Sequence, residues 1–134
     1  MRRAIEEQAT AELPNECCGI LAGRLVDESG KPLAIVDATL RFPLVNEAAS
    51  PREFLSDATS LIAAHVHMRE LGLEIAAVYH SHPLAPPVPS ALDRQRHYYP
   101  DAMSLILSLE NETPTLRGWW LTEDSAEPAE ILEV

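Results

Sequence analysis

Two histidines and an aspartate, which are residue types that bind metal ions, lie together with a serine in one short stretch of the chain. His80 and His82 are two residues apart, and Ser90 and Asp93 follow after a proline-rich segment. The apolar run at 75–79 predicts a buried strand that ends at His80. On a strand, residues i and i+2 face the same side, so the two imidazoles can converge on one ion.

The segment after His82 predicts how a carboxylate returns to the two imidazoles. Three prolines within 86–89 stiffen a loop, and Ser90 can begin a helix that carries Asp93 in its first turn. Two histidines and one aspartate are ligands that zinc accepts, and three protein ligands leave a fourth position for water. The spacing therefore favours a catalytic zinc site over a structural one.

These residue types also have the spacing of a known motif. Seven residues separate His82 from Ser90, and two separate Ser90 from Asp93. This resembles the JAMM (MPN-plus) metalloprotease family, whose motif is a distant Glu, then His-Ser/Thr-His, seven residues, Ser, two residues and Asp. The distant glutamate is Glu16, in a segment similar to the family's Glu-x-x-Gly-x-Leu-x-Gly. The likeness extends over about 11–121 and resembles the short prokaryotic branch of the family.

The resemblance implies an α/β fold with a mixed β-sheet flanked by helices, the JAMM/MPN, cytidine-deaminase-like architecture. It implies one zinc ion per chain, held by His80, His82 and Asp93. It also implies that Glu16 is the base that transfers the proton and that Ser90 donates a hydrogen bond to the oxyanion. The implied reaction is hydrolysis of the amide bond after the C-terminal tail of a ubiquitin-like or sulfur-carrier protein. The implied substrate is a conjugate of such a protein.

These residues also have simpler interpretations, which stay open at the level of sequence. Metal-free relatives in the family act as protein-interaction scaffolds, although all five matched positions are present here. Alternatively, zinc only stabilises the fold, so that its removal would unfold the chain. Ser90 and Asp93 also fit a capping box at a helix start, and we expect the cap and the site to coexist. Without the segment that follows it, Glu16 would be an ordinary surface acid.

The other histidines are weaker candidates for the site. His65 and His67 repeat the His-x-His spacing, but they lie in a helix-like run. There, positions i and i+2 are about 200° apart around the axis, so the two rings cannot share an ion. His97 lies one helical turn after Asp93, where it either hydrogen-bonds to the carboxylate or packs nearby.

Length and composition fit one folded domain spanning 1–134. Hydrophobic residues make up 46% of the chain, and no apolar run is long enough to cross a bilayer. The net charge of −11 argues against a nucleic-acid partner, which needs a basic surface. Cys17 and Cys18 are adjacent, so on a strand they point to opposite faces, and we expect them to be buried without a disulfide. Reduced cysteines and the lack of a signal-like leader predict a cytoplasmic protein with no membrane partner.

Helix-like and strand-like segments alternate along the chain. We expect helices over 2–12, from Ser56 or Asp57 to Gly72, and over 90–99. We expect strands over 17–26, 33–45, 73–80, 103–109, 116–122 and 130–134. The inner stripe of the second helix is predicted to be Leu61, Ile62, Ala64, His65 and Met68.

Two features suggest contacts with other chains. Members of the resembling family usually carry a β-strand before the first helix, whereas this chain begins almost directly in that helix. We therefore expect either a start further upstream or an uncovered sheet edge, which favours a homodimer because exposed edges pair with other chains. Trp119 and Trp120 alternate on an expected strand, so one ring should point inward and the other outward, where it could contact a partner.

Overall fold

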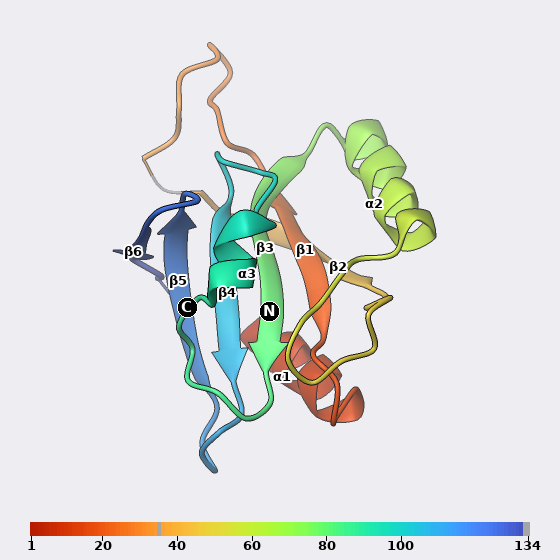
Figure 1. Ribbon diagram of the computed structural model, residues 1–134. Helices are drawn as coiled ribbons and strands as arrows, with labels where there is room; N and C mark the ends of the chain where they lie inside the picture. Colours follow the sequence, from red (N-terminus) through yellow and green to blue (C-terminus); the bar gives the residue numbers. More distant parts are fainter. Residues whose placement is uncertain (35, 133–134) are drawn as a thin grey trace.

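A six-stranded sheet forms the centre of the protein (Figure 1). The structure is a computed structural model that describes residues 1–34 and 36–132. The strands are β1 (Cys18–Gly23), β2 (Ala38–Leu44), β3 (Glu74–His82), β4 (Met103–Ser108), β5 (Thr115–Leu121) and β6 (Ala126–Ala129). Their order is β2-β1-β3-β4-β5-β6; β3 and β4 run parallel, and the other neighbouring pairs run antiparallel. This mixed sheet confirms the predicted fold class.

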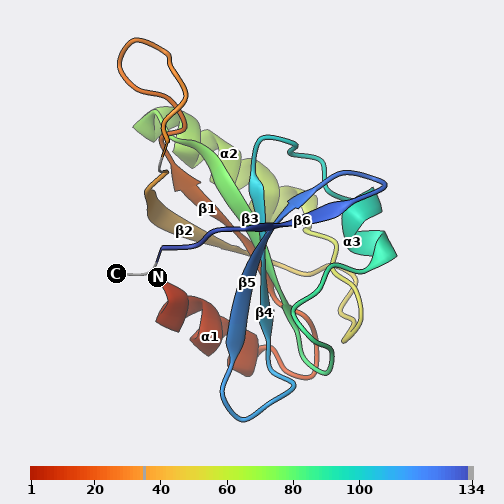
Figure 2. The same cartoon turned by 90° about the vertical axis from the view of Figure 1, so that its left-hand side faces the viewer.

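Helices flank both faces of the sheet. They are α1 (Arg2–Ala11), α2 (Ala58–Leu71) and α3 (Ala91–Gln95). Ile5 and Ala9 of α1 are buried in a core on one face, and Ala64 and Met68 of α2 are buried in a second core on the other. Figure 2 shows α1 and α3 on opposite sides of the sheet. The face opposite α1 is therefore the one that α3 can reach.

Successive side chains on a strand point to opposite faces of the sheet, so neighbouring residues belong to different cores. Cys17 packs in the core of α1 and Cys18 in the core of α2, and both thiols are buried and free, as predicted. On β3, Tyr79 is likewise buried in the α1 core. His80 and His82 therefore point to the opposite face.

The second helix begins and ends where its sequence signals predict. The Asp57 side chain accepts a hydrogen bond from Ser60 N (2.9 Å), which caps the helix start, and Gly72 ends the helix in the left-handed region at φ 66°. The predicted inner stripe was too wide, because Ile62 and His65 are exposed. Around the axis, Ile62 lies about 140° and His65 about 80° from the midpoint of the buried positions Ala64 and Met68. None of the helices in the described ranges is long and apolar enough to span a membrane.

The third helix is shorter than predicted. It ends at Gln95 instead of continuing to Tyr99, and Arg96 is its C-cap. Pro100 disfavours helical backbone at the residue before it, and the chain leaves the helix ahead of this position. The short helix still carries Asp93 in its first turn, as the spacing required.

Three strand predictions were wrong in their bounds. The strand predicted at 17–26 ends at Gly23. The strand predicted at 33–45 begins at Ala38, because the chain first completes the hairpin connection through a bridge between Val26 and Pro32. The last strand lies at Ala126–Ala129 instead of 130–134, of which 133 and 134 lie outside the described residues. A tight turn at 122–125 returns the chain to β5 at once, and the edge position of β6 tolerates its proline. The sheet edges are β2 and β6, and the homodimer stays a prediction.

Candidate metal centre

His80, His82 and Asp93 bring three metal-binding atoms to one point. The two Nε2 atoms lie 3.1 Å apart, and Asp93 Oδ2 lies 3.2 Å from each of them. Ligand atoms held by a tetrahedral zinc ion at about 2.0–2.1 Å lie about 3.3 Å from one another, so the triangle has the size that such an ion requires. Two imidazole nitrogens and a carboxylate oxygen could therefore hold one metal ion here. We call these three residues the ligand triangle.

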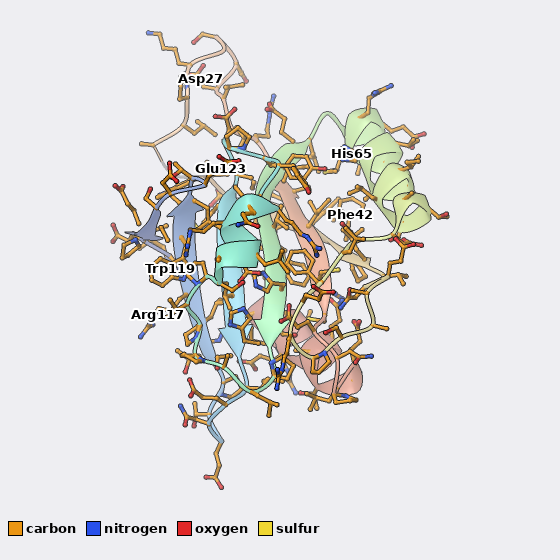
Figure 3. All side chains as sticks on the ribbon, viewed as in Figure 1. Asp27, Phe42, His65, Arg117, Trp119 and Glu123 are labelled. Carbon is orange, nitrogen blue, oxygen red and sulfur yellow. The ribbon has the colours of Figure 1, made fainter. Side chains whose placement is uncertain are left out.

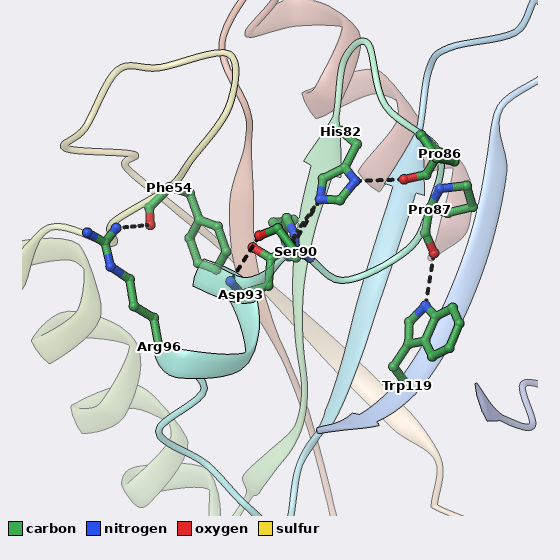
Figure 4. A network of polar contacts seen from close by, with 9 residues as sticks. Phe54, His82, Pro86, Pro87, Ser90, Asp93, Arg96 and Trp119 are labelled. Carbon is green, nitrogen blue, oxygen red and sulfur yellow. Dashed lines mark hydrogen bonds and ion pairs between the residues drawn. The ribbon is translucent and has the colours of Figure 1, made fainter. Parts of the chain in front are cut away.

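The end of β3 and the start of α3 position the ligand triangle. The hydroxyl of Ser90 accepts a hydrogen bond from Asp93 N (3.0 Å), and Asp93 Oδ2 accepts one from Ser90 N (2.9 Å). The predicted capping box is thus present. Figure 4 shows this helix start next to the imidazole of His82. The same carboxylate oxygen takes part in the cap and in the ligand triangle, so the cap orients the ligand.

The protonation states in the ligand triangle favour a bound cation. Complete burial lowers the pKa of His80, so its imidazole stays neutral and keeps a lone pair. Burial opposes ionisation of Asp93, but close contacts of its carboxylate with the imidazoles of His80 and His82 outweigh it and hold the pKa of this carboxyl well below its usual range. Burial also opposes protonation of His82, yet the hydrogen bond to Asp93 and the carbonyl of Pro86 raise its pKa. The centre therefore attracts positive charge.

A backbone carbonyl orients the ring of His82. Its Nδ1 lies 2.8 Å from the carbonyl oxygen of Pro86. Because a carbonyl only accepts, Nδ1 carries a proton, and in the neutral ring Nε2 then holds the lone pair that a metal ion would bind. Such a partner on the second ring nitrogen is typical of histidines that bind metals.

The pairing of β1 with β3 carries Glu16 towards the ligand triangle. In the antiparallel register of these strands, Cys18 lies opposite His80. Continuing this register by two residues places Glu16 opposite His82. The charges of His82 and Asp93 both act on the Glu16 carboxyl, which places it within electrostatic reach of the ligand triangle. Residues 64 positions or more apart in the chain thus form one site.

The Glu16 side chain is buried and ready to exchange a proton. It is 3% exposed, and its Oε1 has no hydrogen-bond partner within residues 1–34 and 36–132. Burial raises its pKa to about 8, His82 opposes this shift, and the charges of Asp93 and Glu53 add to it. A carboxyl that titrates near neutral pH beside a metal-binding group is suited to accept and return a proton.

Ser90 is exposed and hydrogen-bonds to Asp93 of the ligand triangle. Its oxygen accepts the capping hydrogen bond from Asp93 N, so its O–H remains available as a donor to a molecule bound at the ligand triangle. The structure thus brings all five predicted site residues to one region. The catalytic roles of Glu16 and Ser90 remain predictions.

Sequence reasoning missed two residues that shape the site. The ring of Phe54 stacks on the imidazole of His80, with centroids 4.6 Å apart. Asn46 is buried and donates to the carbonyl oxygens of Glu16 (3.0 Å) and Glu53 (3.1 Å). It thereby ties the Glu16 segment to the loop that carries Phe54. The turn-forming character of Asn46 is the only local signal, and it does not reveal which segments the amide joins.

The remaining histidines lie outside the ligand triangle. His65 projects from α2 (Figure 3) and lies 3.1 Å from a tyrosine hydroxyl, while His67 packs edge-on against Phe42 with centroids 5.7 Å apart. The two rings have separate neighbours, which confirms that they do not share an ion. His97 Nε2 donates to a backbone carbonyl in the following loop (3.1 Å) and not to Asp93, so the packing alternative holds.

Comparison with known proteins assigns this centre to a family. The model of the prokaryotic homologs of the JAB domain matches residues 1–122. The chain belongs to this family. The predicted relationship with JAMM/MPN-plus proteins is thereby confirmed.

Relatives of this JAB-domain chain agree in sequence and in structure. It is 35% identical over 103 residues to the desampylase of Haloferax volcanii, an alignment that covers 76% of this chain and 68% of the relative. It is 32% identical to a Desulfitobacterium hafniense protein of known solution structure, with a TM-score of 0.75, covering 98% of this chain and 86% of that one. A Salinibacter ruber protein of known solution structure shares the fold, with a TM-score of 0.67. It is 24% identical, and the alignment covers 99% of this chain and 86% of that one.

Proposed function

We propose that this JAB-domain protein is a zinc-dependent isopeptidase or peptidase. Its reaction is hydrolysis of the amide bond after the C-terminal tail of a ubiquitin-like or sulfur-carrier protein. The observation that carries the proposal is the ligand triangle, whose atoms lie 3.1–3.2 Å apart. His80, His82 and Asp93 would hold one zinc ion per chain. Similarity to a desampylase supports a ubiquitin-like conjugate as the substrate class.

The residues around the ligand triangle divide the chemistry. A bound zinc ion supplies a Lewis acid that polarises a carbonyl and lowers the pKa of a water ligand to around 7. Glu16 takes a proton from the attacking water and returns it to the leaving amine, a task that suits a buried carboxyl whose Oε1 has no hydrogen-bond partner among the described residues. Ser90 donates a hydrogen bond from its hydroxyl to the oxyanion that forms on the scissile carbonyl.

The proposal covers the chain from residue 1 to residue 134 as one catalytic domain. Its location would be the cytoplasm, which the free thiols of Cys17 and Cys18 support. The net charge of −11 favours substrates that present a basic face or tail, because opposite charges speed encounter.

The proposal is tested with a ubiquitin-like protein attached to a lysine side chain, incubated with the purified protein. We expect cleavage directly after the modifier's C-terminal residue, loss of cleavage after treatment with a chelator, and recovery on addition of zinc. Circular dichroism of the chelated protein should show an intact fold, which separates catalytic from structural zinc. Cleavage that survives complete metal removal would contradict the proposal, as would chelator-induced unfolding.

A further inference from the structure

Three consecutive carbonyls of the loop between His82 and Ser90 accept hydrogen bonds from side chains of three strands. Ala85 O accepts from the hydroxyl of Ser108 on β4 (2.6 Å). Pro86 O accepts from Nδ1 of His82 on β3 (2.8 Å). Pro87 O accepts from Nε1 of Trp119 on β5 (2.9 Å). Figure 4 shows the last two bonds side by side, on adjoining residues of the loop.

The conformation of the loop depends on these donors because the loop forms few hydrogen bonds of its own. Four of the seven residues in 83–89 are prolines, which have no N–H to donate. One backbone bond, from Val88 N to Pro86 O (2.8 Å), lies within the loop. The prolines narrow the backbone choices, but they do not determine where the carbonyl of Pro86 lies relative to His82. That placement comes from contacts with the sheet.

The two outer donors flank the bond to His82. Ser108 is 2% exposed and pairs directly with His82 in the parallel register of β3 and β4. Trp119 is half-buried, and its indole N–H reaches the residue immediately after Pro86. Ser108 and Trp119 therefore hold the carbonyls on either side of the one that orients the histidine.

We propose that Trp119 is a positioning residue for the metal centre. By fixing the carbonyl of Pro87, its indole N–H keeps the adjoining carbonyl of Pro86 in place. This keeps the proton of His82 on Nδ1 and the lone pair of Nε2 directed into the ligand triangle. The consequence for metal binding rests on the proposed function, whereas the effect on the ring of His82 belongs to the protein alone.

A purely structural role for Trp119 makes a different prediction. If the hydrogen bond from the indole N–H did no more than anchor the loop, its loss would lower stability and leave the ring of His82 unchanged. Trp119→Phe removes the N–H and retains most of the aromatic surface. Trp120→Phe is the matched control, because its neighbouring ring lies on the other face of β5 and is 44% exposed.

The test combines zinc affinity with the proton position on His82. Removing the direct partner of a metal-binding histidine weakens metal binding about 10- to 100-fold. Trp119 acts on His82 only through the loop carbonyls, so we expect Trp119→Phe to weaken zinc binding less, by roughly 5- to 10-fold. Competition with a chromophoric chelator measures this loss. In the metal-free protein, ¹H–¹⁵N spectra of the neutral imidazole should show Nδ1–H for wild type and Trp120→Phe, and a larger Nε2–H share for Trp119→Phe.

Ser108→Ala provides an independent variant, because it releases the carbonyl on the other side of Pro86. We expect the same direction of change in zinc affinity and in the proton position. An unchanged proton position and affinity in folded Trp119→Phe would overturn the inference, as would an equal change in Trp120→Phe. If Trp119→Phe failed to fold, an unaltered His82 in Ser108→Ala would overturn it. Absence of zinc binding in wild type would refute the proposed function, and the proton position would still decide the role of Trp119.

Discussion

Tyr79 and His80 are buried neighbours on β3, yet they belong to polar clusters of opposite character on the two faces of the sheet. On the α1 face, the hydroxyl of Tyr79 donates to Gln8 Oε1, and Arg41 donates to the same oxygen (2.8 Å) and to the hydroxyl (3.2 Å). Donors meet acceptors throughout this cluster. On the α3 face, three ligand atoms converge on one point, and Glu16 Oε1 has no partner within residues 1–34 and 36–132.

This difference separates residues that stabilise the fold from those that serve chemistry. A buried polar cluster whose groups are all paired is complete without a ligand and makes the packing specific. A buried cluster that gathers lone pairs and an unpaired carboxyl lowers stability unless an ion or substrate completes it. Substitutions on the α3 face should therefore alter metal binding or rate, and those on the α1 face should alter stability alone.

The largest effect on rate is expected from Glu16→Gln, which keeps the shape of the side chain but removes the base. Loss of a general base typically slows turnover by roughly 100- to 10,000-fold. Zinc should stay bound, because Glu16 is not part of the ligand triangle. Turnover of one conjugate, measured as a pH–rate profile with zinc content alongside, checks this. An unchanged rate would make Glu16 a structural acid, and lost zinc would make it a ligand.

A smaller loss of rate is expected from Ser90→Ala. Deleting one donor to an oxyanion typically costs on the order of 100-fold in rate, and deleting the cap costs about 1 kcal/mol of stability. Zinc content should be unchanged. Single-turnover cleavage and urea unfolding of the same preparation separate the two effects. A folded variant with full rate would show that Ser90 serves only as the helix cap.

Tyr79→Phe tests the other side of the comparison. It leaves Gln8 and Arg41 each with one part-buried hydrogen bond fewer, which should lower the free energy of unfolding by about 1–2 kcal/mol. Zinc affinity and rate should match those of wild type, since the substitution lies on the α1 face. Chemical unfolding and zinc titration are the measurements. A loss of zinc affinity would show that the two clusters are coupled through β3.

The pH dependence of stability tests the protonation of Glu16. In chelated protein, burial raises the pKa of Glu16 from 4.5 to about 8, so the folded state holds this proton more tightly than the unfolded state does. The resulting stability is fully present below pH 4.5 and is lost as the pH rises through about 8. Relative to Glu16→Gln, wild type should lose about 1 kcal/mol or more between pH 6 and pH 9. Parallel curves for the two proteins would contradict the raised pKa.

Local sequence was sufficient to predict the parts of the site that depend on near neighbours. Strand alternation places His80 and His82 on one face, and the capping box places Asp93 at a helix start. The burial of Glu16 is different, because it depends on the pairing of β1 with β3 across a long separation in sequence. The stacking of Phe54 on His80 likewise depends on a loop whose path is determined by Asn46.

Element bounds failed where a single residue outweighs the surrounding pattern. The third helix stops before Pro100, although the residues leading up to it had suggested a continuous helix. The last strand was predicted at 130–134, but it lies at Ala126–Ala129 and contains Pro128, which an edge strand tolerates. In both cases the sequence pattern predicted the type of element, and the place of the segment in the fold determined where the element begins or ends.

The central claim, that His80, His82 and Asp93 bind one metal ion, is tested most directly by measuring zinc per chain. Elemental analysis of wild type, His82→Ala and His65→Ala, each dialysed against the same zinc buffer, makes the comparison. We expect one zinc per chain in wild type and in His65→Ala. We expect none in His82→Ala, where only two protein ligands remain. Full zinc occupancy in His82→Ala, or its loss in His65→Ala, would contradict the claim.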